Sequence, residues 1–212
     1  MRVILITAFE PFGMDSMNPT ETVLADLPET LNDMKVLTVT LPVAYDHCFE
    51  ALLPLIEKHD PEIILHLGYA KGRNRVSLER VAINCNESKM PDNLGHVLDG
   101  TPIVKGGPDG LFTSLPIKAL KERYRKKSLP AEISNSAGTY VCNNLFFRTM
   151  HHVMTFNKNT KVGFIHIPAL PEMTSNENIP SMSKSMITDI IVQTLDTVLD
   201  SFDIRESVQE DE

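Results

Sequence analysis

The 212-residue sequence lacks the features of a membrane or exported protein. The apolar run at its start, in MRVILITAFEPF, is followed by Glu and Pro and is too short for a signal sequence or a membrane helix. It is expected to form a first buried strand instead. Cysteine is scarce: the chain has only Cys48, Cys85 and Cys142, an odd number at unrelated spacings. This set, without an export signal, predicts a cytoplasmic protein with reduced thiols.

Signatures of metal and nucleic-acid binding are missing as well. The chain has no CxxC or HExxH motif and no His/Cys spacing typical of a zinc site, so no metal is expected. The formal net charge is −8, and Lys and Arg are concentrated only in KERYRKK at 121–127. This balance argues against binding to nucleic acid or to an anionic membrane. The basic stretch is expected to be a solvated helix end.

The segments that are present alternate between strand and helix patterns. Short β-branched runs bounded by Gly, Pro or Asn predict strands over 2–7, 35–40, 62–67, 77–84 and 161–167. Apolar residues spaced three and four apart predict helices over 44–56 (despite Pro54), 145–156 and 187–202. In NPTE (18–21), Asn18 is a predicted helix N-cap and Pro19 a predicted first helical residue. Alternating strands and helices predict an α/β protein with a mostly parallel sheet covered on both faces.

Length and composition favour a single domain. A chain with 42% hydrophobic residues and no low-complexity run can bury one core of the α/β size class. We expect this domain to span residues 1–203. The remaining residues, 204–212, include the acidic end RESVQEDE and are expected to be a flexible tail, because this end is too polar to pack.

The stretch SAGTYVCNNLFF (136–147) points to a reactive cysteine. Thr139 is expected to cap a helix that Tyr140 opens, which places Cys142 in the first turn. A helix N-terminus stabilises a thiolate, so we expect the pKa of Cys142 to lie below its usual value of about 8.5. The same backbone amides can receive an oxyanion. A disulfide or a zinc ligand is disfavoured, which leaves a core residue as the alternative to a nucleophile.

Two further residues could complete a nucleophilic site. His166 ends an apolar strand, so it is expected at the same carboxyl edge of the sheet as the turn before Cys142. Glu79 lies on an apolar strand face, so its carboxylate needs a hydrogen-bonding partner. A triad in which the acid orients the histidine satisfies both residues. The alternatives are a structural role for His166 and an ion pair between Glu79 and Arg73.

Four blocks of sequence carry a resemblance to a known family. TAFEPFG, GRNRVSLERVAIN, SAGTYVCN and GFIHIP occur in this order along the chain. They resemble the TGFEPFG, glutamate, cysteine and histidine blocks of the pyroglutamyl-peptidase I family, also called pyrrolidone-carboxylate peptidases, the C15-type cysteine peptidases. The likeness runs from residue 3 to about residue 202. It implies Glu79, Cys142 and His166 as the catalytic triad of a cofactor-free, single-domain, three-layer α/β/α sandwich.

The resemblance also implies an activity, an assembly and a substrate site. The implied enzyme is an omega peptidase that removes an N-terminal pyroglutamyl (5-oxoprolyl) residue from peptides through a thioester, and it assembles into a homo-oligomer, a dimer or a tetramer. Because a pyroglutamyl ring is flat and uncharged, Phe9 and Phe12 could sandwich it, although both could instead cap the core. The expected substrate-binding residues are Phe9, Phe12, Asn18, Tyr69, Lys89, Tyr140 and Val141.

Three positions depart from the family's pattern. Tyr69 and Met173 stand where Gln is common, and Lys89 in NESKMPDN replaces a usual Arg. In the family, that Arg lies near the oxyanion site, so its replacement matters most. The three changes bear on efficiency and fine specificity.

Two other functions compete with this one. The first is a thiol-dependent amidase of other small acyl or lactam substrates, and the second is a protein that binds pyroglutamyl peptides but is catalytically impaired through Lys89.

Overall fold

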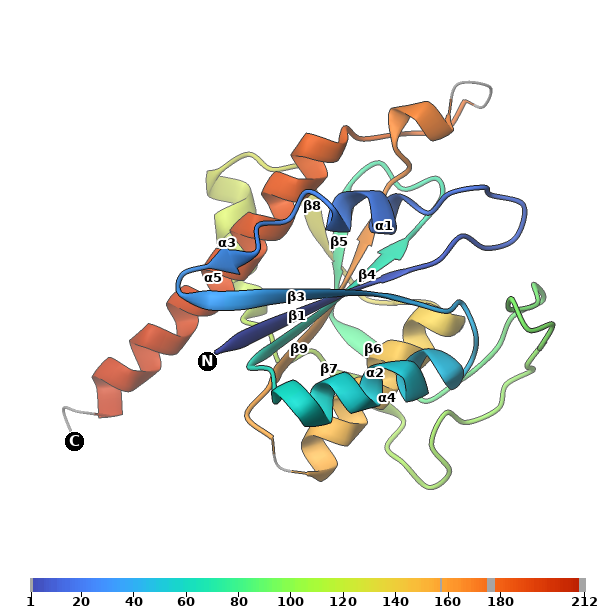
Figure 1. Cartoon of the computed structure of the whole chain (residues 1–212), viewed down its shortest axis with the longest axis horizontal. Helices are drawn as coiled ribbons and strands as arrows, with labels where there is room; N and C mark the ends of the chain where they lie inside the picture. Colours follow the sequence, from blue (N-terminus) through green and yellow to red (C-terminus); the bar gives the residue numbers. More distant parts are fainter. Residues whose placement is uncertain (1, 157, 175–177, 210–212) are drawn as a thin grey trace.

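The molecule is built around one sheet of seven strands, in the order β2-β3-β1-β4-β9-β5-β8 (Figure 1). The computed structural model describes residues 2–156, 158–174 and 178–209, with side chains as far as residue 202. The strands of this sheet are β1 (Val3–Phe9), β2 (Thr30–Leu31), β3 (Met34–Leu41), β4 (Ile63–Tyr69), β5 (Val76–Glu79), β8 (Ala131–Ser134) and β9 (Lys161–Ile167).

Helices cover both faces of the sheet, as the sequence predicted (Figure 1). One face carries α1 (Pro19–Leu24), α3 (Ile117–Lys126) and α5 (Lys184–Gln209), and the other carries α2 (His47–His59) and α4 (Val141–Thr155). Strand β1 contributes to both cores, since Ile4 and Ile6 face one and Leu5 and Phe9 face the other. A strand buried on both faces has a continuous apolar sequence, which explains the run VILITAF. The predicted α/β/α sandwich is confirmed.

The strands are mostly parallel, with antiparallel pairings between β2 and β3 and between β5 and β9. Strands β1, β3, β4 and β9 run in the same direction. Strands β5 and β8 are parallel to each other, but β5 is antiparallel to β9. The carboxyl ends of β5 and β8 therefore lie toward the amino end of β9, on the side of the sheet away from the carboxyl end of β9.

The predicted strand 77–84 is wrong as a single element, because the chain leaves the large sheet at Arg80. Its second half is β6 (Val81–Ile83), which pairs with β7 (Gly110–Phe112) in a separate two-stranded sheet. The backbone of Arg80 serves both sheets. Its N–H donates to the carbonyl of Ser134 in β8 (2.8 Å), and its carbonyl accepts from the N–H of Thr113 (2.9 Å). Side-chain periodicity cannot reveal this change of partner.

The predicted helices are present. Asn18 caps α1, because its Oδ1 accepts from the N–H of Thr20 at 3.1 Å, and Pro19 is the first helical residue. Helix α2 continues through Pro54. Helix α5 extends to Gln209, past the predicted boundary at 203, and residues 210–212 lie outside the described part of the chain. The division into domain and tail stays a prediction. None of the helices described is long and apolar enough to cross a membrane.

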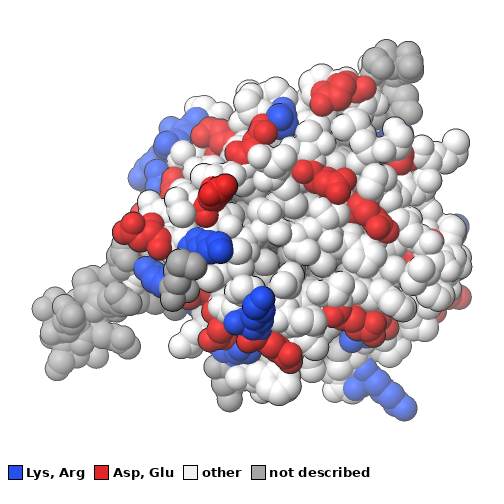
Figure 2. All heavy atoms as spheres, viewed as in Figure 1, with Lys and Arg blue, Asp and Glu red and all other residues white. Residues whose placement is uncertain are grey.

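Charged side chains of both signs are interspersed on the face shown in Figure 2. No broad basic surface is visible on this face. The basic stretch 121–127 begins within α3 and ends just beyond it, as expected of a helix end.

A buried histidine connects the sheet to α4. His66 of β4 is fully buried, and its Nδ1 and Nε2 lie 2.9 Å and 3.1 Å from the hydroxyls of Thr7 and Thr149. Thr149 donates its hydroxyl proton to the carbonyl of Leu145, so it must accept from Nε2–H of His66. Thr7 then donates to Nδ1. Both ring nitrogens are satisfied in the neutral form, and burial lowers the pKa of His66 to about 3.

This neutral histidine is expected to make the protein less stable in mild acid. The folded-state pKa lies below the unfolded-state value, so the contribution is complete above about pH 6.5 and is lost as the pH falls. Between about pH 7 and about pH 5 it should decrease the free energy of unfolding by about 2 kcal/mol. Urea unfolding at both pH values should show this loss in the parent and not in His66→Asn. Equal pH dependence of both proteins, or an imidazole of His66 that titrates near its ordinary pKa by NMR, would contradict it.

Candidate active site

His166 and Glu79 meet across adjacent strands. In the antiparallel register of β5 and β9, Ser77 lies opposite His166 and Glu79 opposite Phe164, so the two residues are diagonal neighbours. Oε1 of Glu79 lies 2.8 Å from Nδ1 of His166, and the residues are 0% and 5% exposed. An ionised carboxylate can only accept, so Nδ1 carries the proton and Nε2 is left as a base.

The same oxygen of Glu79 binds a second donor. Nη1 of Arg73 donates to Oε1 at 2.7 Å, so the His–Glu pair and the ion pair, which the sequence offered as alternatives, occur together. Oε2 is buried without a hydrogen-bond partner among the described residues. Ser134 lies opposite Glu79 in β8, and its hydroxyl donates to the carbonyl of Ser136 (3.2 Å). Burial opposes ionisation, but His166 first, and then the hydroxyl of Ser134 and the charge of Arg73, hold the pKa of Glu79 below its usual value.

Cys142 is the second residue of α4, so its predicted place in the first turn is confirmed. The N-cap residue is Tyr140, and the predicted cap by Thr139 is wrong. The hydroxyl of Thr139 donates to the carbonyl of Glu87 at 2.7 Å, and the N–H of Glu87 donates back to the carbonyl of Thr139 at 2.9 Å. Thr139 thus ties the loop after β6 to the start of α4. Cys142 is a partly exposed free thiol.

The prediction that Cys142 has a lowered pKa is wrong. The pKa of Cys142 is raised to about 12, first by burial of the sulfur among protein atoms and then by the charge of Glu79, and Arg73 and the backbone amide of Cys142 oppose this only in part. Burial also lowers the pKa of His166, against the effect of Glu79. At neutral pH the site therefore holds a neutral thiol and a neutral imidazole.

The prediction that the strand before Cys142 ends at the same side of the sheet as the strand of His166 is also wrong. Because β8 is antiparallel to β9, the end of β8 and the end of β9 lie at opposite edges of the sheet. Helix α4 packs against β9 and is joined to it by residues 156–160 only, so the helix runs back along the strand. The charges of Glu79 and Arg73 both influence the pKa of the Cys142 thiol.

Two asparagines that the sequence analysis missed hold the first turn of α4. Both Asn143 and Asn144 are fully buried. Asn143 accepts from the N–H of Ile83 (2.9 Å) and donates to the carbonyl of the same residue (2.8 Å), which fixes α4 to β6. Asn144 donates to Oδ1 of Asp46 (3.0 Å), just before α2. The available signal was two adjacent amides within the otherwise apolar start of the helix, VCNNLFF, because buried amides need hydrogen-bonding partners.

An aromatic cluster lies at the N-terminus of α4. The ring of Phe12 is 6.4 Å from the rings of Tyr69 and Tyr140, and Tyr140 is 5.5 Å from Tyr45. Phe12 is partly exposed, whereas Phe9 is 2% exposed and belongs to the core. Phe9 therefore packs in the core, which was the alternative to a contact with the pyroglutamyl ring, and Phe12 is the phenylalanine whose ring can face a ligand.

Two of the expected substrate-binding residues make structural contacts. Asn18 is 2% exposed, and besides capping α1 its Nδ2 donates to the carbonyl of Glu10 at 3.0 Å, which holds the FEPF loop. Val141 is 1% exposed in the core beneath α4. Contact of either residue with a ligand stays a prediction.

The family-variant residues lie in three different settings. Tyr69 belongs to the aromatic cluster. Lys89 is exposed in a loop that Tyr140 holds by donating its hydroxyl to the carbonyl of Pro91 at 2.9 Å, so this lysine is tethered near the start of α4. Met173 lies in the short 3-10 helix η1 (Pro171–Met173) and packs against the core on the α1, α3 and α5 face.

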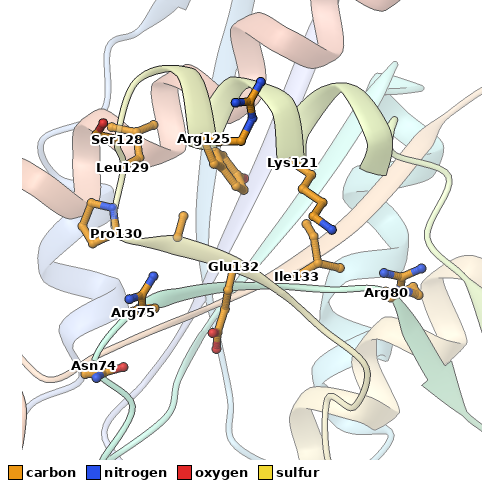
Figure 3. Close-up of a pocket in the computed structure, with 12 residues that line it drawn as sticks. Asn74, Arg75, Arg80, Lys121, Arg125, Ser128, Leu129, Pro130, Glu132 and Ile133 are labelled. Atoms are coloured by element: carbon orange, nitrogen blue, oxygen red, sulfur yellow. The ribbon is translucent and has the colours of Figure 1, made fainter.

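A groove of 780 Å³ between α3 and β8 is a separate feature (Figure 3). Several basic residues line it, but they do not converge. Arg125 points away from β8, Arg75 lies at the opposite end from Lys121 and Arg80, and Glu132 points to the other side of the sheet from α3 (Figure 3). The groove borders α3, whereas Phe164, which lies next to His166 on the same face of β9, packs in the core beneath α2 and α4. Within the described residues, no three His, Cys, Asp or Glu side chains are grouped so that they could hold a metal ion.

Gly68 gives a test of how tightly His166 is held. It lies opposite His166 in β4, and a Cβ at this position would come within 2.9 Å of Cδ2 of His166 and 2.7 Å of the Phe164 ring. Gly68→Ala should therefore displace the imidazole and lower kcat about tenfold to a hundredfold, as small misplacements of catalytic groups do. Gly110→Ala is a suitable control, since the same test there meets only contacts of 3.3 Å or more. Full kcat in Gly68→Ala would show that the imidazole position tolerates this crowding.

Comparisons with known proteins point to a single family. The profile of the pyroglutamyl peptidase family matches residues 1–201. The pyrrolidone-carboxylate peptidase of Vibrio campbellii is 38% identical over 202 residues, covering 95% of this chain and 94% of that protein. The enzyme of the same name from Bacillus cytotoxicus is 41% identical over 189 residues, or 88% of either chain.

Solved structures extend the likeness to the fold. The pyroglutamyl peptidase I of Bacillus amyloliquefaciens has a TM-score of 0.88 and 37% identity, covering 93% of this chain and 94% of that one. A mutant pyrrolidone carboxyl peptidase of Pyrococcus furiosus has a TM-score of 0.90 and 35% identity, covering 94% of this chain and 99% of that one. The resemblance of the four sequence blocks is thus confirmed over nearly the whole chain, which belongs to the pyroglutamyl peptidase family.

Proposed function

We propose that the protein is a cysteine peptidase that removes an N-terminal pyroglutamyl residue from peptides. Cys142 is the nucleophile, His166 the general base and acid, and Glu79 the residue that orients His166. The observation that carries this proposal is the buried 2.8 Å contact between Glu79 and Nδ1 of His166, beside a free thiol in the first turn of α4. This is the arrangement of an activated nucleophile, its base and an orienting acid.

Cys142 and His166 are both neutral before the reaction, and this sets the order of the proton transfers. Because the thiol of Cys142 is protonated at rest, Nε2 of His166 must take its proton as Sγ attacks the pyroglutamyl carbonyl. The imidazolium then donates this proton to the nitrogen of the leaving peptide, the C–N bond breaks, and a thioester remains on Cys142. His166 next takes a proton from water, the hydroxide attacks the thioester, and pyroglutamate leaves as the thiol is restored.

Two groups of residues fit the rest of the reaction. The backbone amides of the first turn of α4 are positioned to stabilise the oxyanion, with Lys89 as a candidate for added positive charge. The cluster of Phe12, Tyr69 and Tyr140 offers aromatic faces and edges to a flat, uncharged lactam ring. Ring recognition by stacking requires no charged partner, which suits the lactam.

We further propose that the protein acts in the cytoplasm as a homo-oligomer, a dimer or a tetramer. The three cysteines are free thiols, as expected in a reducing compartment. Large apolar side chains are exposed in the loop before β7, where Leu94 is 56% and Val97 55% exposed, and on β7, where Phe112 is 68% exposed. Contact with another subunit would remove these side chains from water.

A panel of fluorogenic amides tests the proposed function. The parent should release the fluorophore from pyroglutamyl amide and leave prolyl and glutamyl amides intact, and Cys142→Ser should abolish turnover while retaining the fold. Cys48→Ser is the matched control, since Cys48 is a fully buried thiol whose pKa is raised by burial, and it should retain kcat. Turnover of other acyl amides would indicate the amidase, and binding of pyroglutamyl amide without turnover would indicate the binding protein.

A further inference from the structure

Arg73 connects three segments around the catalytic pair. It lies in the loop between β4 and β5, where its N–H closes a turn onto the carbonyl of Ala70 (3.2 Å) and Gly72 adopts a φ of +89°. Its Nη1 donates to Oε1 of Glu79 at 2.7 Å, and its Nη2 lies 3.5 Å from the carbonyl of Ser136, in the loop that leads to Cys142. The guanidinium therefore spans the loop, the end of β5 and the approach to α4.

The bond from Arg73 fixes which oxygen of Glu79 faces His166. Oε1 is held from two directions, by Nη1 of Arg73 and Nδ1 of His166, while Oε2 is buried and has no partner in the described part of the chain. A buried carboxylate that loses one of two donors is left with an uncompensated charge and is free to turn its other oxygen toward any donor. The side chain of Arg73 is 30% exposed and that of Glu79 is 0% exposed. The positive charge of a partly solvated arginine therefore compensates the negative charge of a fully buried acid.

We infer that Arg73 is a positioning residue of the active site, which holds Glu79 in the orientation and charge state that His166 needs. The rigid fork of an arginine suits this task, because one nitrogen can bond the carboxylate while another reaches a carbonyl. The effect expected on kcat/KM rests on the proposed function, whereas the effect expected on the reactivity of the Cys142 thiol does not.

The charges around the two reacting groups give the expected signs. Glu79 and Arg73 are the charged groups that act on His166, and Arg73 lowers its pKa. The same two groups act on Cys142, where Arg73 again lowers the pKa. The other titratable groups coupled to the thiol are Tyr45, Tyr140 and Cys48. Removal of the positive charge should therefore raise the pKa of both His166 and Cys142.

Three variants separate positioning from general stability. Arg73→Met removes charge and hydrogen bonds, and Arg73→Lys keeps the charge without the fork. Arg75→Met makes the same change in net charge two residues away, at an exposed arginine. Two profiles are measured for each folded protein: the rate of Cys142 alkylation by iodoacetamide against pH, followed by peptide mass spectrometry, and kcat/KM for a pyroglutamyl amide against pH.

The expected results differ between the variants. In Arg73→Met, Cys142 should be alkylated more slowly at each pH below its pKa. The acid limb of kcat/KM should move to higher pH, and its plateau should fall about tenfold, as for loss of one hydrogen bond to a charged group. Arg73→Lys should keep the position of the acid limb and lose part of the plateau. Arg75→Met should match the parent in both profiles.

Two results would overturn the inference. One is an Arg73→Met protein whose alkylation and kcat/KM profiles superimpose on those of Arg75→Met, even if its melting temperature is lower. The other, decisive if Arg73→Met does not fold, is an Arg73→Lys protein with the full parental plateau. A parent that fails to hydrolyse pyroglutamyl amide would instead contradict the proposed function, and the alkylation profiles would still test the role of Arg73.

Discussion

The organisation of the site depends on one buried carboxylate, that of Glu79. A charge with no solvent exposure persists only if donors surround it, and here Arg73 and His166 both bond its Oε1. This requirement links elements that are distant in sequence. The loop after β4 supplies the guanidinium, β5 supplies the acid and β9 supplies the imidazole. The tautomer of His166, and with it the availability of Nε2 as a base, follows from the ionisation of Glu79.

The second constraint is the cost of burying the thiol. Burial raises the pKa of Cys142 to about 12, and the roughly 1 kcal/mol that a helix N-terminus contributes in favour of the thiolate is too small to offset this shift. Burial wins, so the thiolate is not formed in advance. A neutral Cys142 makes His166 more important, because the base must remove a proton during the attack. The ring of His166 is closely packed, because a Cβ at Gly68 would come within 2.9 Å of it and the centroid of the Phe164 ring is 4.8 Å away.

Much of this architecture could be predicted from the sequence. The buried strands, the Asn18 cap and the docking helix α5 follow from periodicity and local capping chemistry, which depend on neighbouring residues. The partnership of Glu79 with His166 was predicted from the need of a carboxylate on an apolar face for a partner. The remaining features depend on tertiary structure. The break at Arg80, the reversal of β5 and β8, and the buried contacts of Asn143 and Asn144 arise from pairings between distant segments, which no local pattern encodes.

If Cys142 carries the acyl group, the thioester can be trapped on this residue. A pyroglutamyl ester with a good leaving group should acylate the enzyme faster than water resolves it. Mixing enzyme and ester, quenching in acid, digesting at low pH and mapping by mass spectrometry should place one pyroglutamyl group on the peptide that contains Cys142. Because thioesters survive acid, this adduct should persist after the quench. A pyroglutamyl group on Cys48 or Cys85, or turnover with a product burst and no adduct on any cysteine, would contradict the account.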